Sequence, residues 1–224
     1  KIEALPAGLH PALLFERLCT AYPQAFVSLV SLPGWGCWLG ASPELLLAQE
    51  ADGFKTMSLA GTRLAGAAGD WGAKEKHEQQ LVTDYICAQL EAAGLEVEVG
   101  ARETVEAGQV QHLRNLIAAR GEASGFDLAT ALHPTPAVCG LPVAAARQYL
   151  AEHEAHDRRL YGGFLGPVDA AGQATFYVNL RSMELQAGRA ALYLGGGIVA
   201  GSEPEAEWQE TEHKAATLLR ILQA

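Results

Sequence analysis

The run Gly195-Gly196-Gly197-Ile198-Val199 is followed after a short gap by Glu205-Ala206-Glu207-Trp208-Gln209-Glu210-Thr211-Glu212-His213-Lys214. The first stretch has the glycines and branched residues typical of a strand end, and the second has the pattern of a helix. Positions i, i+3 and i+7 fall on one helical face, so Glu207, Glu210 and Lys214 point the same way. This helix therefore presents two carboxylates and an ammonium group beside a glycine-rich strand end.

A second helical pattern far upstream begins with Lys74-Glu75-Lys76-His77-Glu78 and again spaces two acids three residues apart. If the two helices meet, their faces gather four carboxylates. Like charges about 4 Å apart repel by roughly 4 kcal/mol at an effective dielectric constant near 20. Such a cluster requires a hard cation or raised carboxyl pKa values. We therefore expect an acidic Mg²⁺ site next to a lysine that can hold an anionic substrate.

Composition limits the class of protein. The chain has 224 residues, of which 49% are hydrophobic, and its formal net charge is −10, so we expect a globular domain that does not bind nucleic acid. No apolar stretch approaches the roughly 20 residues that span a bilayer, and the N-terminal residues lack a signal-peptide core. These features predict a cytoplasmic protein without membrane contacts. The four cysteines have no ligand spacing, so we expect free thiols.

The periodicity along the chain predicts an α+β fold in which helices cover the outside of antiparallel sheets. The expected helices are 11–20, 73–93, 126–132, 143–154 and 204–222. The expected strands are 26–32, 39–48, 54–59, 95–99, 164–168, 175–185 and 190–199. Short turns after residues 32 and 51 suggest that the first three strands form an antiparallel meander.

Two shorter patterns are candidates for chemistry. Glu44 is a single acid between a proline turn and an apolar run, so burial would raise its pKa and let it act as a general acid. A turn or capping role for Glu44 is an equally good interpretation. The run Leu59-Ala60-Gly61-Thr62-Arg63 follows a strand and offers backbone N–H groups to an anion, although such a run is often only a turn.

A larger set of motifs occurs in one order along the chain. The set comprises Ser42-Pro43-Glu44-Leu45-Leu46, Leu59-Ala60-Gly61-Thr62-Arg63, Lys76-His77-Glu78, Leu132-His133-Pro134-Thr135-Pro136, Tyr161-Gly162-Gly163, Asn179-Leu180-Arg181, Gly195-Gly196-Gly197 and Glu207-Trp208-Gln209-Glu210 with Lys214. In this order they resemble the chorismate-utilising enzymes, and most closely the isochorismate synthases of menaquinone or siderophore biosynthesis. The resemblance runs from about Leu29 to the C-terminus.

The resemblance implies roles for individual residues. Glu78 and Glu210 would bind Mg²⁺ directly, and Glu75 and Glu207 would complete its shell directly or through water. Glu44 matches the general acid of the family, which protonates the departing C4 hydroxyl of chorismate while water adds at C2. The remaining matches are to groups that hold or approach the substrate, namely Gly61, His133, Tyr161, Arg181, Gly195 and Lys214. For His133, packing of a proline-loop histidine against backbone is an alternative, and the glycine run could also simply form a bulge.

One departure from the family pattern concerns the general base. The isochorismate synthases use a lysine in a Lys-x-x-Leu-(Ser/Ala)-Arg strand, and the family spacing would put this strand shortly before Lys1. We therefore expect residues 1–224 to be the C-terminal part of one catalytic domain whose N-terminal part is absent.

Related activities leave alternatives open. Ala60 stands where aminodeoxychorismate synthases carry a lysine, and Val82-Thr83-Asp84 and Gly140-Leu141-Pro142-Val143 depart from the anthranilate synthase patterns. A salicylate synthase, or a non-catalytic module that binds chorismate and Mg²⁺, remains an alternative. His153 and His156 resemble a metal cluster, but beside Arg158 and Arg159 they are more typical of a solvated helix end.

Overall fold

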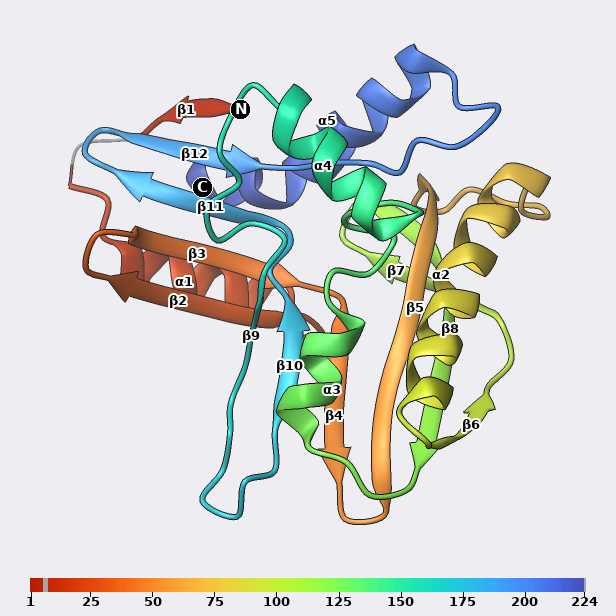
Figure 1. The fold of residues 1–224 in the computed structure, drawn as a ribbon. Helices are drawn as coiled ribbons and strands as arrows, with labels where there is room; N and C mark the ends of the chain where they lie inside the picture. The colour runs from red at the N-terminus through yellow and green to blue at the C-terminus, as the bar shows by residue number, and fades with distance from the viewer. Residues whose placement is uncertain (6–7, 224) are drawn as a thin grey trace.

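The computed structural model describes residues 1–5 and 8–223 and has two antiparallel sheets with helices packed against them (Figure 1). The first sheet has the strand order β1 (Ile2–Ala4), β12 (Arg189–Tyr193), β11 (Ser182–Gln186), β3 (Gly36–Ser42), β2 (Phe26–Leu32). The second has the order β6 (Glu96–Val99), β8 (Val110–Arg120), β5 (Gly53–Leu64), β4 (Leu45–Glu50), β10 (Thr175–Val178), β9 (Phe164–Leu165), and β7 (Glu103–Ala107) also pairs with β8. The expected α+β class with antiparallel sheets is confirmed.

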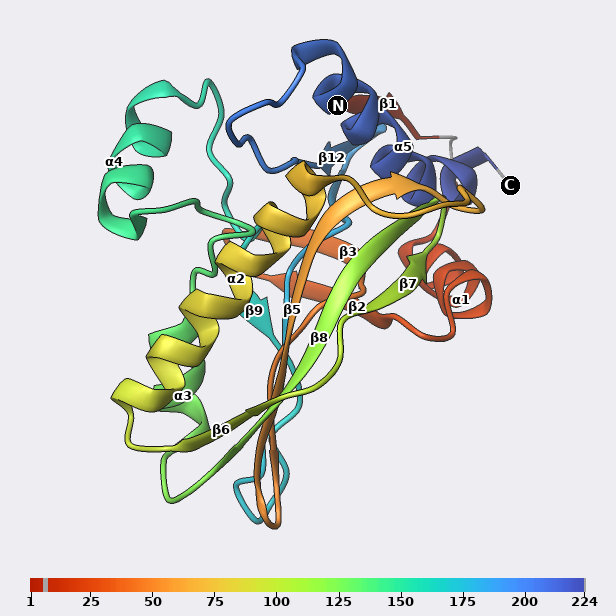
Figure 2. The ribbon, with the colours of Figure 1, turned by 90° about the vertical axis from the view of Figure 1, so that its right-hand side faces the viewer.

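Each sheet has its own hydrophobic core beneath a pair of helices. Leucines of α1 (Pro11–Ala21) and α5 (Pro204–Gln223) pack on the first sheet, and α2 (Ala73–Ala92) and α3 (Gly125–Leu132) pack on the second (Figure 2). In α2 the buried residues Val82, Ile86 and Leu90 recur at i, i+4 and i+8 and form one apolar stripe. This stripe fixes the rotation of α2 about its axis. α4 (Val143–His153) has no fully buried residue.

The starts of α2 and α5 bring the two acidic segments to the same end of the molecule. Pro204 occupies the first turn of α5, where its missing N–H costs nothing, and Glu205 and Glu207 follow where the helix dipole favours negative charge. Glu75 lies in the first turn of α2. Both helices therefore turn their N-terminal ends toward the strand end at the glycine run.

The predicted strands 39–48 and 175–185 are each broken in two, which corrects the expected meander. β3 and β4 lie in different sheets, and so do β10 and β11. Pro43 has no N–H to continue a ladder, and Arg181 has a left-handed backbone with φ of 48°. The two crossings lie side by side, because Val178 N–H donates to the Glu44 carbonyl and Ala41 N–H donates to the Arg181 carbonyl. The chain thus changes sheets twice at one place.

Strands β7 and β8 are not part of the predicted pattern. β8 turns the polar side chains Gln111, His112 and Asn115 into the protein interior, where each is at most 9% exposed. Inward polar residues interrupt the hydrophobic alternation that identifies a strand. Strands 164–168 and 190–199 are also shorter than expected, since β9 ends at Leu165, with an isolated bridge between Val168 and Ala174 beyond it, and β12 ends at Tyr193.

No helix of the described residues is long and apolar enough to cross a membrane. Cys19, Cys37, Cys87 and Cys139 are free thiols, as expected.

Candidate active site

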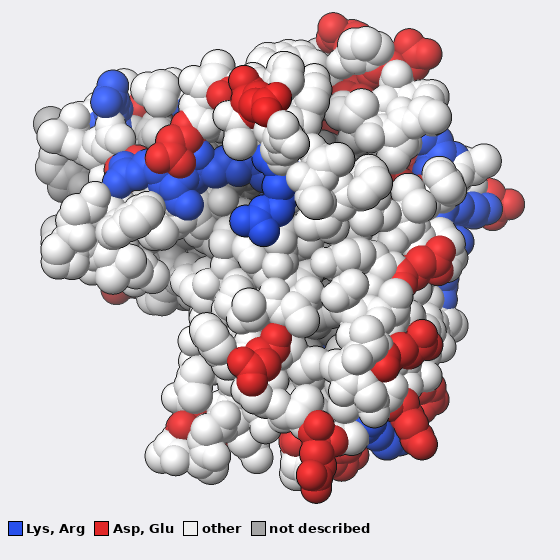
Figure 3. Space-filling model, viewed as in Figure 1, with Lys and Arg blue, Asp and Glu red and all other residues white. Residues whose placement is uncertain are grey.

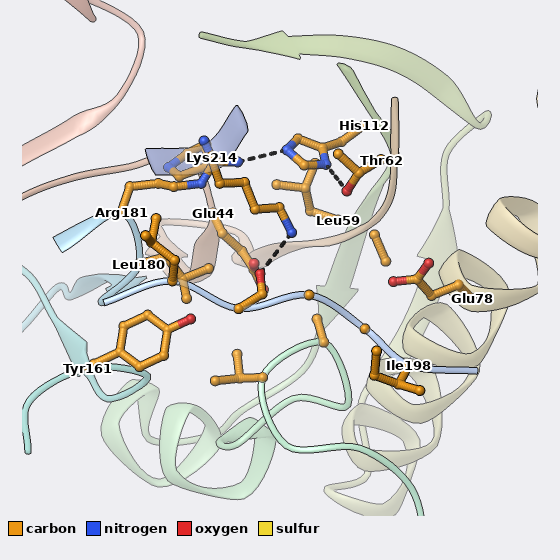
Figure 4. A pocket seen from close by; sticks show the side chains of 18 of the residues that line it. Glu44, Leu59, Thr62, Glu78, His112, Tyr161, Leu180, Arg181, Ile198 and Lys214 are labelled. Atoms are coloured by element: carbon orange, nitrogen blue, oxygen red, sulfur yellow. Dashed lines mark hydrogen bonds between the residues drawn. The ribbon is translucent and has the colours of Figure 1, made fainter. Parts of the chain in front are cut away.

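A cavity of about 310 Å³ lies where the two sheet crossings approach the glycine run (Figure 4). Glu44 and Arg181 come from the crossings, Tyr161 from the loop before β9, and Lys214 from α5. These residues are far apart in the sequence, and all four were expected from it. On the face seen in Figure 3, Lys and Arg side chains gather along a hollow in the upper half, although the chain carries a net charge of −10. The molecule is therefore locally basic on this face.

Glu44 is a buried acid in this cavity. Its backbone is held at the first crossing, where Ser42 Oγ accepts from the Glu44 N–H at 3.3 Å and donates to the Val178 carbonyl at 2.5 Å. Burial raises the pKa of Glu44 to about 8, and the positive charges of Lys214 and Arg181 oppose that rise. A carboxyl group with this pKa is largely protonated near neutral pH. Glu44 can therefore donate a proton inside the cavity.

Arg181, which is buried, and Lys214, which is partly buried, are the cations beside Glu44. Arg181 is 7% exposed, and burial lowers its pKa to about 10, so the guanidinium remains charged. Burial also lowers the pKa of Lys214, and its pairing with Glu210 opposes this. Lys214 Nζ donates to the Gly195 carbonyl at 3.0 Å and to Glu210 Oε1 at 2.5 Å. The Tyr161 hydroxyl lies against Gly195, where an added Cβ would be 3.1 Å from it.

The acids of α2 and α5 converge on the glycine run. An added Cβ at Gly196 would lie 3.3 Å from Glu210 Oε1 and 3.7 Å from Glu207 Oε2, and one at Gly197 would collide with Glu78 Oε1. A side chain at Gly197 would displace the Glu78 carboxylate, so the glycine lets the three carboxylates approach the backbone in their present positions. Burial raises the pKa of Glu78 to about 7, and the charge of Glu210 adds to the rise. The two helices therefore do bring their acids together.

The arrangement of these acids differs from a four-carboxylate shell. Glu207 Oε1 pairs with Lys74 Nζ at 2.5 Å, as Glu210 pairs with Lys214. Glu75 turns its carboxylate toward Gly72 at the start of its own helix. Among the described residues, no three histidine, cysteine, aspartate or glutamate side chains form a group that could hold one metal ion as they stand. The carboxylates of Glu78, Glu207 and Glu210 thus converge on the glycine run, whereas Glu75 lines a neighbouring cavity together with Glu207 and Glu210.

The donors themselves fit a hard divalent cation. All three groups are carboxylates, which Mg²⁺ prefers as ligands. Glu207 Oε2 is buried and has no hydrogen-bond partner, although buried polar atoms are almost always paired. A cation at the glycine run would satisfy this oxygen and relieve the repulsion at Glu78.

His133 is not among the residues that line the cavity. Its Nε2 lies 2.6 Å from the Gly162 carbonyl, and its ring packs edge-on against Phe164. The structure therefore favours the packing alternative over a contact with substrate. The physical reason is that His133 ends α3 and is held by Gly162 and by Phe164 of β9, whereas Ala137 and Val138 further along the same loop do line the cavity.

His112 lines the cavity and was missed by the sequence analysis. It lies in the middle of β8, accepts from Arg181 Nη2 at 3.1 Å, and its Nδ1 lies 3.1 Å from the Gly61 carbonyl. The hairpin signal Ala107-Gly108 before Val110 was the one local indication of strands there. Gly61 itself lines the cavity, as expected, with φ of 70°.

The histidines after α4 are placed largely as expected. His153 Nδ1 contacts the Tyr149 carbonyl on an exposed helix end, and Arg158 forms a two-point ion pair with Glu154. His156 and Arg158 also contribute to the wall of the cavity.

Comparison with known proteins identifies relatives over almost the whole chain. A family model described as chorismate binding enzyme matches residues 4–223. Isochorismate synthase EntC of Escherichia coli (strain K12) is 34% identical over an alignment of 228 residues, gaps included, which covers 96% of this chain and 58% of the relative. The salicylate biosynthesis isochorismate synthase of Pseudomonas aeruginosa is 41% identical over 239 residues, covering 100% of this chain and 50% of the relative.

A solved structure agrees with these relatives. The crystal structure of a putative 2,3-dihydroxybenzoate-specific isochorismate synthase, DhbC from Bacillus anthracis, superposes with a TM-score of 0.88 and 30% identity, covering 96% of this chain and 62% of that one. The resemblance read from the ordered motifs is therefore confirmed. The chain spans between half and about three fifths of the length of these relatives.

Proposed function

Because the chain belongs to the family of chorismate binding enzymes, we propose that it forms the substrate-binding and proton-donating part of an isochorismate synthase. The reaction is the Mg²⁺-dependent conversion of chorismate to isochorismate, for menaquinone or siderophore biosynthesis. One water adds at C2 while the C4 hydroxyl leaves as water, so the composition of the substrate does not change. The relatives named as isochorismate synthases support this proposal.

The observation that carries the proposal is a buried acid with a raised pKa beside one buried and one partly buried cation. Glu44, with its pKa of about 8, is a ready donor for a departing hydroxyl group. Arg181 and Lys214 beside it are suited to the carboxylates of a dianionic substrate. The Tyr161 hydroxyl and the backbone at Gly61 and Gly195 would complete the contacts.

Glu78 and Glu210 would hold the Mg²⁺, Glu207 would support them directly or through water, and Glu75, whose carboxylate lies at Gly72, would do so only through water. The cation would supply positive charge for the ring carboxylate of the substrate and for the clustered acids. The unpartnered Glu207 Oε2 supports this assignment. The acids themselves hold Lys214 in place, since Glu210 accepts one of its hydrogen bonds.

The water-activating lysine expected from the resemblance would come from residues upstream of β1. β1 pairs with β12 so that Ile2 lies opposite Ala191, and Lys1 pairs with Leu192. Any residues preceding Lys1 in a longer protein would continue along Tyr193 and Leu194 toward the glycine run. This register supports a lysine reaching the cavity from that side.

The test is product analysis with chorismate and Mg²⁺, without ammonia, on this chain and on the chain extended upstream by the corresponding segment of EntC. We expect chorismate binding by both proteins and isochorismate from the extended one only. Salicylate with pyruvate would select the salicylate synthase alternative, and binding without any product would select the non-catalytic module. Failure of both proteins to bind chorismate would overturn the proposal.

A further inference from the structure

His112 connects two elements of the cavity that are distant in the sequence. It lies on β8 opposite Thr62 of β5 and is 5% exposed. Nε2 contacts the Arg181 guanidinium at 3.1 Å, and Nδ1 contacts the Gly61 carbonyl at 3.1 Å and Thr62 Oγ1 at 3.3 Å. Figure 4 shows the contacts with Arg181 and Thr62. Its imidazole therefore spans the gap between the β5 turn and the second sheet crossing.

The partners of His112 determine its protonation state and tautomer. A guanidinium has only donors, so Nε2 must accept from Arg181, and a carbonyl only accepts, so Nδ1 must donate to Gly61. Both bonds require a neutral ring. Burial and the nearby charges of Arg181 and Lys214 lower the pKa of His112 to about 3, in agreement with this assignment.

Gly61 and Arg181, the two partners of His112, both have unusual backbone conformations. Gly61 forms the irregularity between Ala60 and Thr62 in the pairing of β5 with β8, with φ of 70°. Arg181 has φ of 48°, a conformation that costs a residue other than glycine about 1–2 kcal/mol. A backbone under strain does not by itself fix where a long side chain points. Side-chain contacts must therefore orient the guanidinium.

The contacts of Arg181 leave part of its hydrogen-bonding capacity free for a ligand. Nη2 donates to His112, and Nη1 donates to Thr217 Oγ1 of α5 at 3.4 Å. A guanidinium has five N–H groups, so three remain after these two bonds. The bond to His112 is the shorter of the two. The imidazole is therefore the stronger restraint on the orientation of the Arg181 guanidinium.

We propose that His112 is a positioning residue, which orients the Arg181 guanidinium toward a substrate carboxylate and couples that orientation to the Gly61 turn. The inference rests on the proposed function, because the carboxylate belongs to the chorismate-like substrate. His112 does not touch the reacting atoms in this proposal. It acts through Arg181, and its effect is on binding.

Three substitutions separate the two contacts of His112. His112→Leu removes both, His112→Asn can still donate toward Gly61 but is too short to reach Arg181, and His112→Gln retains an acceptor for Arg181. A hydrogen bond to a charged group contributes about 1.5–3 kcal/mol, or roughly 10-fold to 100-fold in affinity. We expect the Leu and Asn variants to bind chorismate about 10-fold to 100-fold more weakly by calorimetry with Mg²⁺. The Gln variant should stay within about threefold of wild type.

A double-mutant cycle distinguishes positioning from a merely structural role. If His112 acts through Arg181, His112→Leu should change chorismate affinity little in an Arg181→Met background. Equal losses in both backgrounds would overturn the inference, as would wild-type affinity in the Asn variant. If the Leu variant fails to fold, the Asn variant takes its place in the cycle, since it keeps a polar side chain at the buried position.

The controls separate this inference from the proposed function. Wild-type chain that does not bind chorismate overturns the substrate class and the inference together. Wild-type chain that binds chorismate, with His112 variants that bind equally well, overturns the inference alone.

Discussion

The two halves of the cavity are held together by different interactions. At the sheet crossings, Glu44, Arg181 and His112 are each at most 7% exposed and are fixed by backbone contacts and by one neutral imidazole. At the glycine run, Glu207 and Glu210 are each paired with a lysine side chain. Hydrogen bonds to neutral partners give a fixed geometry, whereas a lysine paired with a carboxylate can be exchanged for another cation. The first half thus has a preorganised geometry. In the second half, a bound cation can replace a lysine as the partner of a carboxylate.

The largest expected effect tests the preorganised half. Glu44→Gln removes the proton donor but keeps a side chain of similar shape, so turnover in the upstream-extended chain should fall about 100-fold to 10,000-fold. Chorismate affinity, measured by calorimetry, should remain close to wild type. Normal turnover in this variant would remove Glu44 from the acid role.

The second half, at the glycine run, is tested by measuring its affinity for Mg²⁺. Glu78→Gln should weaken Mg²⁺ binding, measured by calorimetry on this chain, by at least about tenfold, since even outer-shell partners of a metal contribute that much. Glu75→Gln is the matched control, because the Glu75 carboxylate lies at Gly72 and away from the glycine run. Equal losses of Mg²⁺ affinity in the two variants would indicate that all four acids bind the ion. An unchanged Mg²⁺ affinity in Glu78→Gln would refute the metal assignment.

The pH dependence of stability tests the protonation of Glu44 in the first half. The pKa of Glu44 is raised from 4.5 to about 8, so the folded state holds a proton that the unfolded state releases between these pH values. Unfolding free energy should therefore fall as pH rises from about 5 to 8, by up to about 1.4 kcal/mol per pH unit for this one group. Denaturant unfolding of wild type should show this slope relative to Glu44→Gln.

His112 contributes a pH dependence of opposite sign. Its pKa is lowered from 6.5 to about 3, so the unfolded state binds the extra proton between these values, and this contribution to stability is lost as pH falls through that range. Subtracting the Glu44→Gln curve isolates the Glu44 contribution from it. A flat difference curve would mean that Glu44 is ionised in the folded protein.

The smallest effect concerns a residue placed outside both halves. His133→Leu removes the hydrogen bond to the Gly162 carbonyl and should cost about 1 kcal/mol of unfolding free energy. Chorismate affinity should change less than about twofold, within ordinary measurement error. A tenfold loss of chorismate affinity, measured in the same calorimetric assay, would indicate that His133 contacts the substrate after all.

Much of the fold could be predicted because its helices are locally encoded. The periodicity of α1, α2 and α5 and the acids at i and i+3 are visible in the sequence, and their bounds agree with the structure within two residues. The ordered motifs also singled out Glu44 and Arg181, which the structure places in one cavity. Strands β7 and β8 escaped prediction because β8 buries polar side chains whose partners come from other elements. His112 was missed for the same reason.

The sequence by itself determined which residue types occur together on each helix face and where glycine permits close packing. Only the tertiary structure decided that two predicted strands break to change sheets, that Glu75 turns away, and that His112 connects Gly61 with Arg181. The physical reason is that helix faces depend on neighbours within a few residues. Desolvation, sheet pairing and buried hydrogen bonds depend on partners that are brought together only by folding.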